Sequence, residues 1–534
     1  MVRAAAPRTI GDTELDTAIE AIAQVRVGGE YWGLQPQLPQ APYTLIRVRE
    51  ADVRSDLLQS LQGGETILCW VDAAPREPGL QGSAISFVSG PCDPWHLVTG
   101  AEKIIADPDD ELVLIAALAG RAAHFPCGNG STAPGADRNA LLGRLRLHFA
   151  SCAYSNPFTG EAMGLSEAVE LCAHWRRLID SNRPIAAAIG FAAWKKPTAA
   201  PLLWAGSAGV PFAARPRDIA AGDQVAAWKS RVGATTLAEL EDRGAQLVEV
   251  EDGFIRSVGL GAECVPPLSL VVDRLGAYFD PQRPSELELM LQDGSFSREL
   301  LDRARCLRQL IVEAGVSKYG IGQHNVERRA GGRRHILVPG QVEDDRSVQC
   351  GGGAVTSNII LLSRVRRDAS DAYIIYKPHP DVEAGHRVGA VSEEEAARYA
   401  DEVIRGQPIS SWIDMVDEVH VNTSLAGFEA LMRGKPVTTH GVPFYAGWGL
   451  TRDLGAVPER RTARRTLDEL VAAVLLLYPR YLDPVTGLPC TPEILVRRLV
   501  EGAGARSKGP LVPLRRLQGY MKRRVASLRE WRGQ

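Results

Sequence analysis

Two short runs constrain the fold of this chain more than any other feature of its sequence. The first is YKPHP, residues 376–380, and the second is VHVNTSLAGFEALMRGKPV, residues 419–437. Each is an apolar, β-rich stretch that ends in polar residues, and the second continues into a helical pattern with Ser424 as N-cap and Gly434 as stop. A strand that leads into a helix start presents backbone N–H groups to an anion. The two runs therefore predict a phosphate site at the carboxyl edge of a parallel sheet.

Strand and helix patterns alternate along the C-terminal part of the chain, and a capping box at Ser392, answered by Glu395, marks one helix start. The expected strands are 335–340, 372–377, 419–421 and 436–439, and the expected helices are 357–366, one from 392, 410–416 and 425–433. A second α/β region precedes these, with strands at 184–190 and 246–251, an apolar run at 265–273 and a helical stretch at 284–314. Repeated βα units build parallel sheets covered by helices on both faces.

Two such halves with a cleft between them are typical of the GT-B architecture, so we expect an α/β fold with a GT-B-like pair of Rossmann-type domains. At 534 residues the chain is long enough for two or three domains. The predicted plan is an eroded nucleotide-binding-like half-module (1–150), an acceptor-side α/β domain (151–330), a nucleotide-sugar-binding Rossmann-like domain (331–500) and a basic helical tail (501–534).

The composition argues against several classes of protein. A net charge of −3 gives no reason to expect nucleic acid as a partner. Nine cysteines without a CxxC pair indicate free thiols in a reducing cytosol rather than a zinc ribbon or a disulfide framework. No apolar stretch reaches the length of a membrane-spanning helix, and the N-terminus lacks the long apolar segment of a signal peptide. We therefore expect a cytoplasmic location.

An internal repeat relates the beginning of the chain to its end. Two pairs of segments correspond, 154–171 with 481–499 and 95–125 with 412–440. In the earlier copy Asp110 falls near the position of Ser424, and no YKPHP run precedes it. A carboxylate at a helix start repels phosphate, so we expect this copy to bind no nucleotide and to be retained for packing.

Acidic residues follow the first strand of the C-terminal region. The loop VPGQVEDDRS, residues 338–347, places Glu343, Asp344 and Asp345 at the carboxyl edge of the expected sheet. Carboxylates in such a place serve as nucleophile, general base or metal ligand. The alternative is a solvated acidic turn without a function.

The run EDGFIRSVGLG, residues 251–261, presents a second group of charges on the other half of the expected cleft. Glu251, Asp252 and Arg256 surround an aromatic and glycine-rich turn. The planar guanidinium of Arg256 suits a substrate carboxylate, and an internal ion pair with Asp252 is the alternative.

Two further runs are candidates for ligand contact. In YKPHP, a proline on each side of His379 fixes the backbone, and Lys377 lies beside it. A lone histidine is usually a core residue, but the neighbouring lysine and the later NTS turn favour a site. The aromatic loop at residues 441–453 is either the floor of a sugar pocket or a set of core anchors.

Taken together, these runs resemble the bacterial capsule β-Kdo transferases of KpsC type. The matching segments stand in the family's order between residues 154 and 500: EDGFIRSVGLG, PPLSLVVD, VPGQVEDDRS, YKPHPDVEAGHR, NTSLAGFEALMRGKPV, VPFYAGWGLT and YPRYLDPVTGLPC. The resemblance implies transfer of 3-deoxy-D-manno-oct-2-ulosonic acid (Kdo) from CMP-β-Kdo to a phospholipid-based primer, with retention of the β configuration. The family commonly carries two catalytic modules in tandem, whereas this sequence shows one intact module and one eroded remnant.

The resemblance also implies roles for individual side chains. Retention through two displacements requires a carboxylate nucleophile, which the family pattern gives to Asp345, with Asp344 next in line. Glu251 is the expected acid/base toward the acceptor hydroxyl, and His379 and Ser424 are expected to hold the CMP phosphate. The complete expected donor-binding set is Gln341, Ser347, Lys377, His379, Pro380, Asn422, Thr423, Ser424 and Glu429, with Arg256 for a sugar carboxylate. No Asp-x-Asp motif lies by a phosphate loop, so neither a metal nor another cofactor is expected.

The C-terminal tail has a composition of its own. Residues 506–532 carry nine Lys or Arg against Glu530 alone, and five apolar residues recur at helical spacing. A basic amphipathic helix binds anionic membranes at about 1 kcal/mol per basic residue near the surface, whereas a solvated tail is the alternative. The expected location is therefore peripheral, on the inner face of the bacterial inner membrane. A phospholipid-linked acceptor and capsule export or assembly proteins are the expected partners.

Two other functions remain open at this point. A transferase of sialic acid or glycerophosphate from a CMP- or CDP-activated donor also uses an HP pair and a serine-capped helix. A non-catalytic subunit of a capsule-assembly complex is the second alternative, because the N-terminal remnant indicates that this architecture can lose its site.

Overall fold

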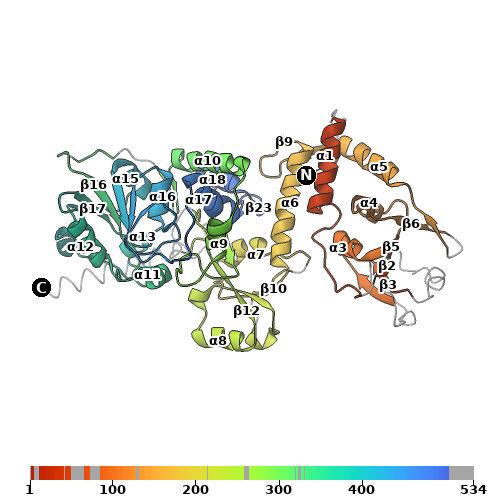
Figure 1. The fold of residues 1–534 in the computed structure, drawn as a ribbon, viewed down its shortest axis with the longest axis horizontal. Coiled ribbons are helices and arrows are strands. Elements are labelled where there is room, and N and C mark those ends of the chain that lie inside the picture. Colours follow the sequence, from red (N-terminus) through yellow and green to blue (C-terminus); the bar gives the residue numbers. More distant parts are fainter. Residues whose placement is uncertain are drawn as a thin grey trace. The chain divides into compact units, whose positions relative to one another are not determined.

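The computed structural model describes residues 2–4, 11–40, 42–49, 65–72, 85–127, 131–207, 209–212, 215–257, 264–318, 320–322, 326–329 and 331–503. Its contacts divide the chain into two compact units, one of residues 1–184 with 203–210 and one of residues 185–202 with 211–534 (Figure 1). The second unit contains two six-stranded sheets, which form the cores of two halves that we call lobe A and lobe B.

Lobe B contains the two signature runs, drawn in teal and blue in Figure 1. Its strands are β16 (His335–Pro339), β17 (Tyr373–Lys377), β18 (Glu402–Val403), β19 (Glu418–Val421), β20 (Val437–Thr439) and β21 (Arg452–Asp453). Its helices are α11 (Arg346–Gly351), α12 (Asn358–Asp368), α13 (Pro380–Glu383), α14 (Glu393–Ala397), α15 (Ile409–Met415) and α16 (Ala426–Met432). All strands pair in parallel in the order β18-β17-β16-β19-β20-β21, which confirms the parallel sheet predicted from the βα alternation.

The sequence explains why these elements form. Strand β16 is buried along its whole length and β17 nearly so, as expected for parallel strands covered on both faces. Leu361 and Leu362 of α12 join Ile336 and Ile374 in one apolar core. The predicted capping box at the start of α14 is present, because Ser392 and Glu395 satisfy each other's backbone N–H groups.

The helix after β19 starts later than predicted. Helix α16 begins at Ala426, and its N-cap position is Leu425 rather than Ser424. The hydroxyl of Ser424 still accepts a hydrogen bond from the backbone N–H of Ala426, at 3.2 Å. Gly434 ends the helix in a left-handed conformation at φ +70°, as its position in the sequence predicts.

Lobe A has a mixed sheet. Its strands are β10 (Ile185–Ile189), β11 (Gln224–Ala227), β12 (Gln246–Asp252), β13 (Ser269–Asp273), β22 (Arg480–Leu482) and β23 (Pro489–Cys490), in that order across the sheet. The first three are parallel and the remaining pairs are antiparallel. Its helices are α7 (Lys196–Leu202), α8 (Ala234–Asp242), α9 (Glu286–Asp293), α10 (Arg298–Glu313), α17 (Leu467–Val471) and α18 (Pro492–Val500), with a short ribbon of β14 (Val316–Ser317) and β15 (Gly320–Ile321).

The helical stretch predicted at 284–314 is two helices, α9 and α10. Gly294 takes an extended conformation after α9, and Ser297 caps α10 by accepting from the backbone N–H of Leu300. A Cβ at Gly294 would lie 2.2 Å from the carbonyl oxygen of Met290, so this close approach of the two backbones requires glycine.

The first unit is a third α/β sheet. Its six-stranded sheet consists of β2 (Tyr43–Val48), β3 (Ile67–Val71), β4 (Ile85–Ser89), β5 (Ala101–Ile105), β6 (Ala123–Pro126) and β7 (Thr132–Pro134), and a small sheet consists of β1 (Val2–Ala4), β8 (Cys152–Ser155) and β9 (Ala162–Met163). Its helices are α1 (Asp12–Val25), α3 (Pro94–Thr99), α4 (Glu111–Leu118), α5 (Arg138–Ala150) and α6 (Leu165–Asn182).

The internal repeat predicted from the sequence is present in the structure. Counted in chain order, the strands of the first unit's main sheet and of lobe B both follow the order 3-2-1-4-5-6. The later segments match in register, because Tyr154 pairs with Met163 as Tyr481 pairs with Cys490. The last strand differs, since β7 pairs antiparallel and β21 pairs parallel. The first unit is therefore a second copy of the lobe B topology.

One domain boundary differs from the predicted plan. The boundary expected after residue 150 lies inside the first unit, because β8 pairs with β1 and α6 packs against α1. The basic tail at 501–534 lies almost wholly outside the described residues, which end at 503. Among the described helices, none combines the length and apolar character needed to cross a bilayer.

Candidate functional site

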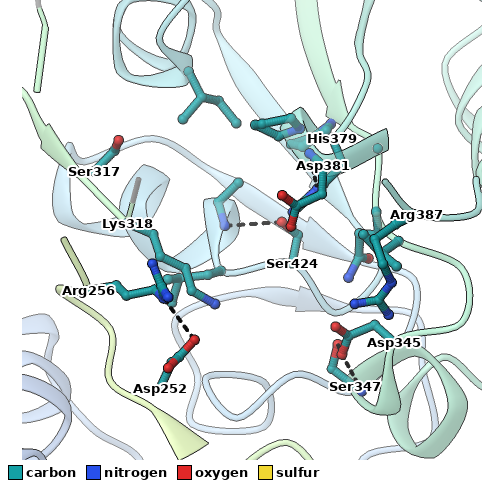
Figure 2. A pocket seen from close by; sticks show the side chains of 18 of the residues that line it. Asp252, Arg256, Ser317, Lys318, Asp345, Ser347, His379, Asp381, Arg387 and Ser424 are labelled. Atoms are coloured by element: carbon teal, nitrogen blue, oxygen red, sulfur yellow. Dashed lines mark hydrogen bonds and ion pairs between the residues drawn. The ribbon is translucent and has the colours of Figure 1, made fainter. Parts of the chain in front are cut away.

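A cavity of about 790 Å³ opens in the second unit where strands β16, β17 and β19 end (Figure 2). Lobe B contributes the loops after these three strands and the start of α16, and lobe A contributes the end of β12, the loop after β13 and the β14 ribbon. The carboxyl ends of parallel strands meet at one edge of a sheet, so loops distant in sequence converge here. The crevice predicted from the two signature runs is therefore a formed pocket.

Eleven of the thirteen predicted site residues line this pocket. They are Glu251, Arg256, Gln341, Asp345, Ser347, Lys377, His379, Pro380, Thr423, Ser424 and Glu429. Asp344 and Asn422 are not among the lining residues. Asp344 is half exposed and pairs with Arg387 at 3.0 Å, and the side-chain amide of Asn422 donates to the carbonyl of Val355 at 2.8 Å. The structure thus assigns Asp344 to a surface ion pair and Asn422 to holding a neighbouring loop.

The carboxylate of Asp345 is held through one of its two oxygens. The backbone N–H and the hydroxyl of Ser347 both donate to Oδ1, each at 3.0 Å. No described residue donates a hydrogen bond to Oδ2. Figure 2 shows the two residues together at the pocket wall. Ser347, expected to bind the donor, therefore orients Asp345 and leaves one oxygen with its lone pairs available for reaction.

His379 lines the pocket as a neutral imidazole. Its Nδ1 accepts from the backbone N–H of Asp381 at 3.1 Å, so the ring proton is on Nε2. Burial, with help from the charge of Lys318, lowers the pKa of His379 to about 4. Lys377 is the last residue of β17, two positions before His379, and burial lowers the pKa of Lys377 as well.

Gln341 and Thr423 fasten two of the pocket loops to each other. The amide nitrogen of Gln341 donates to the hydroxyl of Thr423, and its amide oxygen accepts from the backbone N–H of Thr423, both at 2.9 Å. This two-point contact joins the loop after β16 to the loop after β19, which carry Asp345 and Ser424. The contact fixes the spacing between them.

Glu429 lines the pocket with one of its oxygens engaged. Its Oε1 accepts from the backbone N–H of Lys318 at 3.0 Å, whereas Oε2 is buried and has no hydrogen-bond partner among the described residues. Burial raises the pKa of this carboxyl group. A buried polar atom without a partner is suited to a ligand hydroxyl that reaches it.

Lobe A brings two adjacent carboxyl groups with opposite properties. Burial, reinforced by the neighbouring Asp252, raises the pKa of Glu251 to about 8. Burial acts in the same direction on Asp252, but Arg256 and Lys195 outweigh it and lower the pKa of Asp252 below its ordinary value. Two neighbouring acids whose pKa values move apart are typical of a site in which one exchanges a proton and the other stays charged.

Arg256 does not have the role predicted for it. Its Nε donates to Asp252 at 2.8 Å, its Nη1 to Ser257 and its Nη2 to the carbonyl of Val265. The side chain is 1% exposed. The internal ion pair, which the sequence left open as the alternative, is therefore what the structure contains, and Arg256 keeps Asp252 ionised.

The pocket also contains residues that sequence reasoning missed: Lys195, Tyr278, Lys318, Asp381 and Arg387. Asp381 and Arg387 lie within the recognised YKPHPDVEAGHR run, which follows β17, and Lys195 follows β10. Their positions after predicted strands could therefore have identified these three residues. Lys318 belongs to no motif and reaches the pocket only because the β14 ribbon turns there. Within the described part of the chain, Oδ1 of Asp381 has no hydrogen-bond partner, and burial raises the pKa of this group.

The aromatic loop at 441–453 is largely a core anchor. Tyr445 and Trp448 are fully buried, and only Pro443 and Phe444 of this loop line the pocket. Phe444 packs against Phe254, with ring centroids 4.9 Å apart. The loop therefore supports the pocket from behind and contributes only part of its wall.

The first unit has a carboxylate at the corresponding helix start. There Asp110 caps α4 by accepting from the backbone N–H of Leu112 at 2.9 Å. Its buried carboxylate is paired with Arg49 at 2.7 Å and lies 3.7 Å from Arg47. An internal anion with arginine partners thus stands at the position that corresponds to Ser424 in lobe B, and the absence of nucleotide binding in this copy stays a prediction.

Comparison with known proteins places the chain in a family. The model of the capsule polysaccharide biosynthesis protein family matches residues 223–481. The solved β-Kdo 2,4 transferase of Thermosulfurimonas dismutans KpsC is 34% identical, with a TM-score of 0.51, and the match covers 59% of this chain and 98% of that one. The chain is a KpsC-type member of the capsule polysaccharide biosynthesis family. The predicted family resemblance is therefore confirmed.

Curated relatives also match in sequence. The capsule polysaccharide modification protein LipA of Neisseria meningitidis is 39% identical over 371 residues, which are 68% of this chain and 52% of LipA. The lipopolysaccharide-processing protein LpsZ of Rhizobium meliloti is 46% identical over 239 residues, which are 44% of this chain and 54% of LpsZ. The chain thus spans about half the length of the curated relatives it matches.

No group of three or more His, Cys, Asp or Glu side chains is arranged to hold a metal ion in the part of the chain that the structure describes. Metal-independent chemistry stays a prediction.

Proposed function

We propose that this chain is a retaining glycosyltransferase that moves Kdo from CMP-β-Kdo to a lipid-linked acceptor during capsule or surface polysaccharide biosynthesis. The observation that carries the proposal is the carboxylate of Asp345, held through Oδ1 in a pocket at the sheet edge of a chain similar to a KpsC β-Kdo transferase. A second ionisable carboxyl group, Glu251, belongs to the other lobe of the same pocket.

The first chemical step needs only a nucleophile and a stabilised leaving group. Oδ2 of Asp345 attacks the anomeric carbon C2 of Kdo, the bond from C2 to the phosphate oxygen breaks, and its electron pair leaves with CMP. The CMP phosphate is stable as an anion and requires no proton from the protein. The product is a glycosyl ester on Asp345 with inverted configuration.

The second step transfers the sugar to the acceptor. The acceptor oxygen attacks C2 while Glu251 takes the hydroxyl proton, and the bond from C2 to Asp345 breaks to restore the free carboxylate. The second inversion restores the β configuration. Glu251 suits this task because its raised pKa, about 8, makes it a stronger base than an ordinary carboxylate.

The pocket has groups that complement both anions of the donor. His379 Nε2–H and Lys377 stand at the end of β17, beside Ser424, as donors for the CMP phosphate. Lys318 and Arg387 approach from different sides of the pocket in Figure 2 and can neutralise the Kdo carboxylate. Arg256 is buried and committed to Asp252, whereas the ion pair of Arg387 with Asp344 is exposed and can be exchanged, so we assign the sugar carboxylate to Lys318 and Arg387 instead. Glu429 Oε2 is the acceptor we assign to a ribose hydroxyl.

A donor screen tests this function. Purified chain is incubated separately with CMP-Kdo, CMP-sialic acid and CDP-glycerol, each with a synthetic Kdo–lipid acceptor. We expect turnover with CMP-Kdo alone, and nuclear magnetic resonance of the product should show a β linkage. Turnover only with CMP-sialic acid or CDP-glycerol would favour the other transferases, and none with any donor would favour a non-catalytic subunit.

The cellular setting is part of the proposal. We infer an enzyme on the cytoplasmic face of the inner membrane, because its activated donor is a cytosolic metabolite and its acceptor is a lipid. The basic segment at 506–532 is the membrane contact that its composition suggests. Deletion of residues 504–534 should release the protein from anionic vesicles while turnover on a water-soluble acceptor persists, and unchanged sedimentation with vesicles would contradict this assignment.

A further inference from the structure

Arg346 connects the two lobes beside the pocket, where it contacts the pocket residue Glu251 without lining the pocket itself. It is the first residue of α11 and directly follows Asp345 in lobe B. Its Nη1 donates to Glu251 on β12 of lobe A at 3.2 Å, and it also donates to Glu249 on the same strand. Its guanidinium lies 5.0 Å from the centre of the Phe279 ring. One side chain thus joins the segment of the proposed nucleophile to the strand of the proposed base.

The contact with Glu249 does not by itself require Arg346. Glu249 is also paired with Lys229 at 2.9 Å, a residue of its own lobe that does not line the pocket. Glu251 has a different environment. The charged and titratable groups that face it are Glu249 and Asp252 on β12, Lys195 before α7, Tyr278 after β13 and Arg346 on α11. Of these, Arg346 is the cation that comes from lobe B.

We propose that Arg346 is a positioning residue that holds Glu251 at the pocket and keeps it ionisable for the second chemical step. The inference rests on the proposed function and deepens it, since it separates the two steps. Asp345 is oriented by Ser347 without any help from the Arg346 side chain. The first step therefore does not need the side chain of Arg346, whereas the second needs its guanidinium.

The physical reason is the balance of charge around Glu251. Asp252 and Glu249 oppose a negative charge on Glu251, and Lys195 and Arg346 favour it. An opposite charge within about 4–6 Å lowers the pKa of a carboxyl group by roughly 1–3 units. Loss of the Arg346 charge should therefore raise the pKa of Glu251 further and leave less of the basic form at neutral pH.

The test compares two half-reactions in Arg346→Gln over a range of pH. Formation of the glycosyl-enzyme from CMP-Kdo, followed by intact-protein mass spectrometry, should be little changed. Acceptor-dependent transfer should fall about tenfold or more at pH 7, because the rising part of its pH–rate profile shifts to higher pH by about one unit or more. The transfer rate should recover toward pH 10. When the acceptor is present, the covalent intermediate should accumulate at pH 7 in this variant and not in the wild type.

Two further variants separate charge from geometry. Arg346→Lys keeps the positive charge but loses the planar guanidinium. The rising part of its pH–rate profile should therefore stay within about half a pH unit of the wild type, while the maximal transfer rate falls. Lys229→Gln removes the other partner of Glu249 and should leave the rising part of the profile unmoved. A retained CMP affinity in each variant shows that the pocket is folded, and Arg346→Lys carries the test if Arg346→Gln does not fold.

The outcomes distinguish this inference from the proposed function. Wild type that forms neither adduct nor product would refute the proposed function itself. Wild type that transfers Kdo while Arg346→Gln keeps the wild-type pH–rate profile would refute only the role of Arg346. Equal loss of both half-reactions in Arg346→Gln at every pH would also overturn it, because the side chain would then serve the nucleophile or the fold.

Discussion

At the scale of single residues, the pocket separates side chains that act from side chains that hold them. Asp345 has one oxygen engaged by the backbone N–H and the hydroxyl of Ser347, and Nδ1 of His379 accepts from the backbone N–H of Asp381. Arg256, in contrast, is fully committed to internal partners. Residue type and position in a motif do not determine which of these states a side chain has.

Substitution of the proposed nucleophile should remove catalysis and preserve binding. Asp345→Asn keeps the shape and one hydrogen-bond acceptor for Ser347 but cannot form the glycosyl ester. We expect transfer to fall by at least about a thousandfold, while CMP affinity measured by calorimetry changes little. Ser347→Ala is the companion variant and should lose much less activity. If Asp345→Asn transferred the sugar as fast as the wild type, Asp345 could not be the nucleophile.

The pH dependence of transfer should report Glu251. Its pKa is raised to about 8, so below that pH the group carries its proton and cannot accept one from the acceptor hydroxyl. The acceptor-dependent rate should therefore rise through pH 7 to 9, about tenfold per unit well below the pKa. Glu251→Gln should be slow and flat over the same range. A rate that falls with rising pH in the wild type would contradict this role.

At the scale of secondary-structure elements, the sequence predicts the parallel sheet of lobe B well. Apolar runs such as HILVP and YIIYK form buried strands of a parallel sheet, and most of the pocket lies where these strands end. Features that depend on tertiary contact escaped prediction. The break at Gly294 follows from a close backbone approach, and the place of Lys318 follows from a ribbon whose turn meets α16. Such contacts join segments that have no common periodicity.

The packing of α16 against the aromatic loop should be intolerant of added volume. A Cβ on Gly427 would lie 2.2 Å from the hydroxyl oxygen of Tyr445, which is fully buried and donates to the carbonyl of Ser424. Gly427→Ala should therefore lower the free energy of unfolding by about 1–3 kcal/mol and weaken CMP binding. Thermal and urea unfolding measure this.

The matched control for that substitution is Gly143→Ala. Gly143 also lies within a helix, α5, but a Cβ there meets nothing within 4 Å. Alanine is the better helix former by about 0.5–1 kcal/mol, so this variant should be neutral or slightly stabilised. Equal effects of the two substitutions would show that the contact with Tyr445 has no special importance.

At the scale of the whole molecule, the chain contains one topology twice, and the two copies differ at the corresponding helix start. Both sheets have the strand order 3-2-1-4-5-6, but the first unit has Asp110 and its arginine partners where lobe B has Ser424. The sequence predicted this contrast because a carboxylate and a hydroxyl at a helix start have opposite effects on an anion.

One CMP should therefore bind per chain. Lys377→Met, which alters the lobe B pocket, should remove most of the CMP affinity seen by calorimetry, whereas Asp110→Ala should leave stoichiometry and affinity unchanged. A second equivalent of CMP in the wild type, lost in a variant of the first unit, would show that the eroded copy still binds nucleotide.

The central claim is that Asp345 forms a covalent bond to the transferred sugar. The most direct measurement is mass spectrometry of the protein quenched in acid after incubation with CMP-Kdo alone, followed by peptide mapping. Our account predicts one Kdo residue added per chain, located on Asp345 and absent from Asp345→Asn. Efficient transfer to the acceptor with no adduct in any quenched sample, or an adduct on another residue, would contradict it.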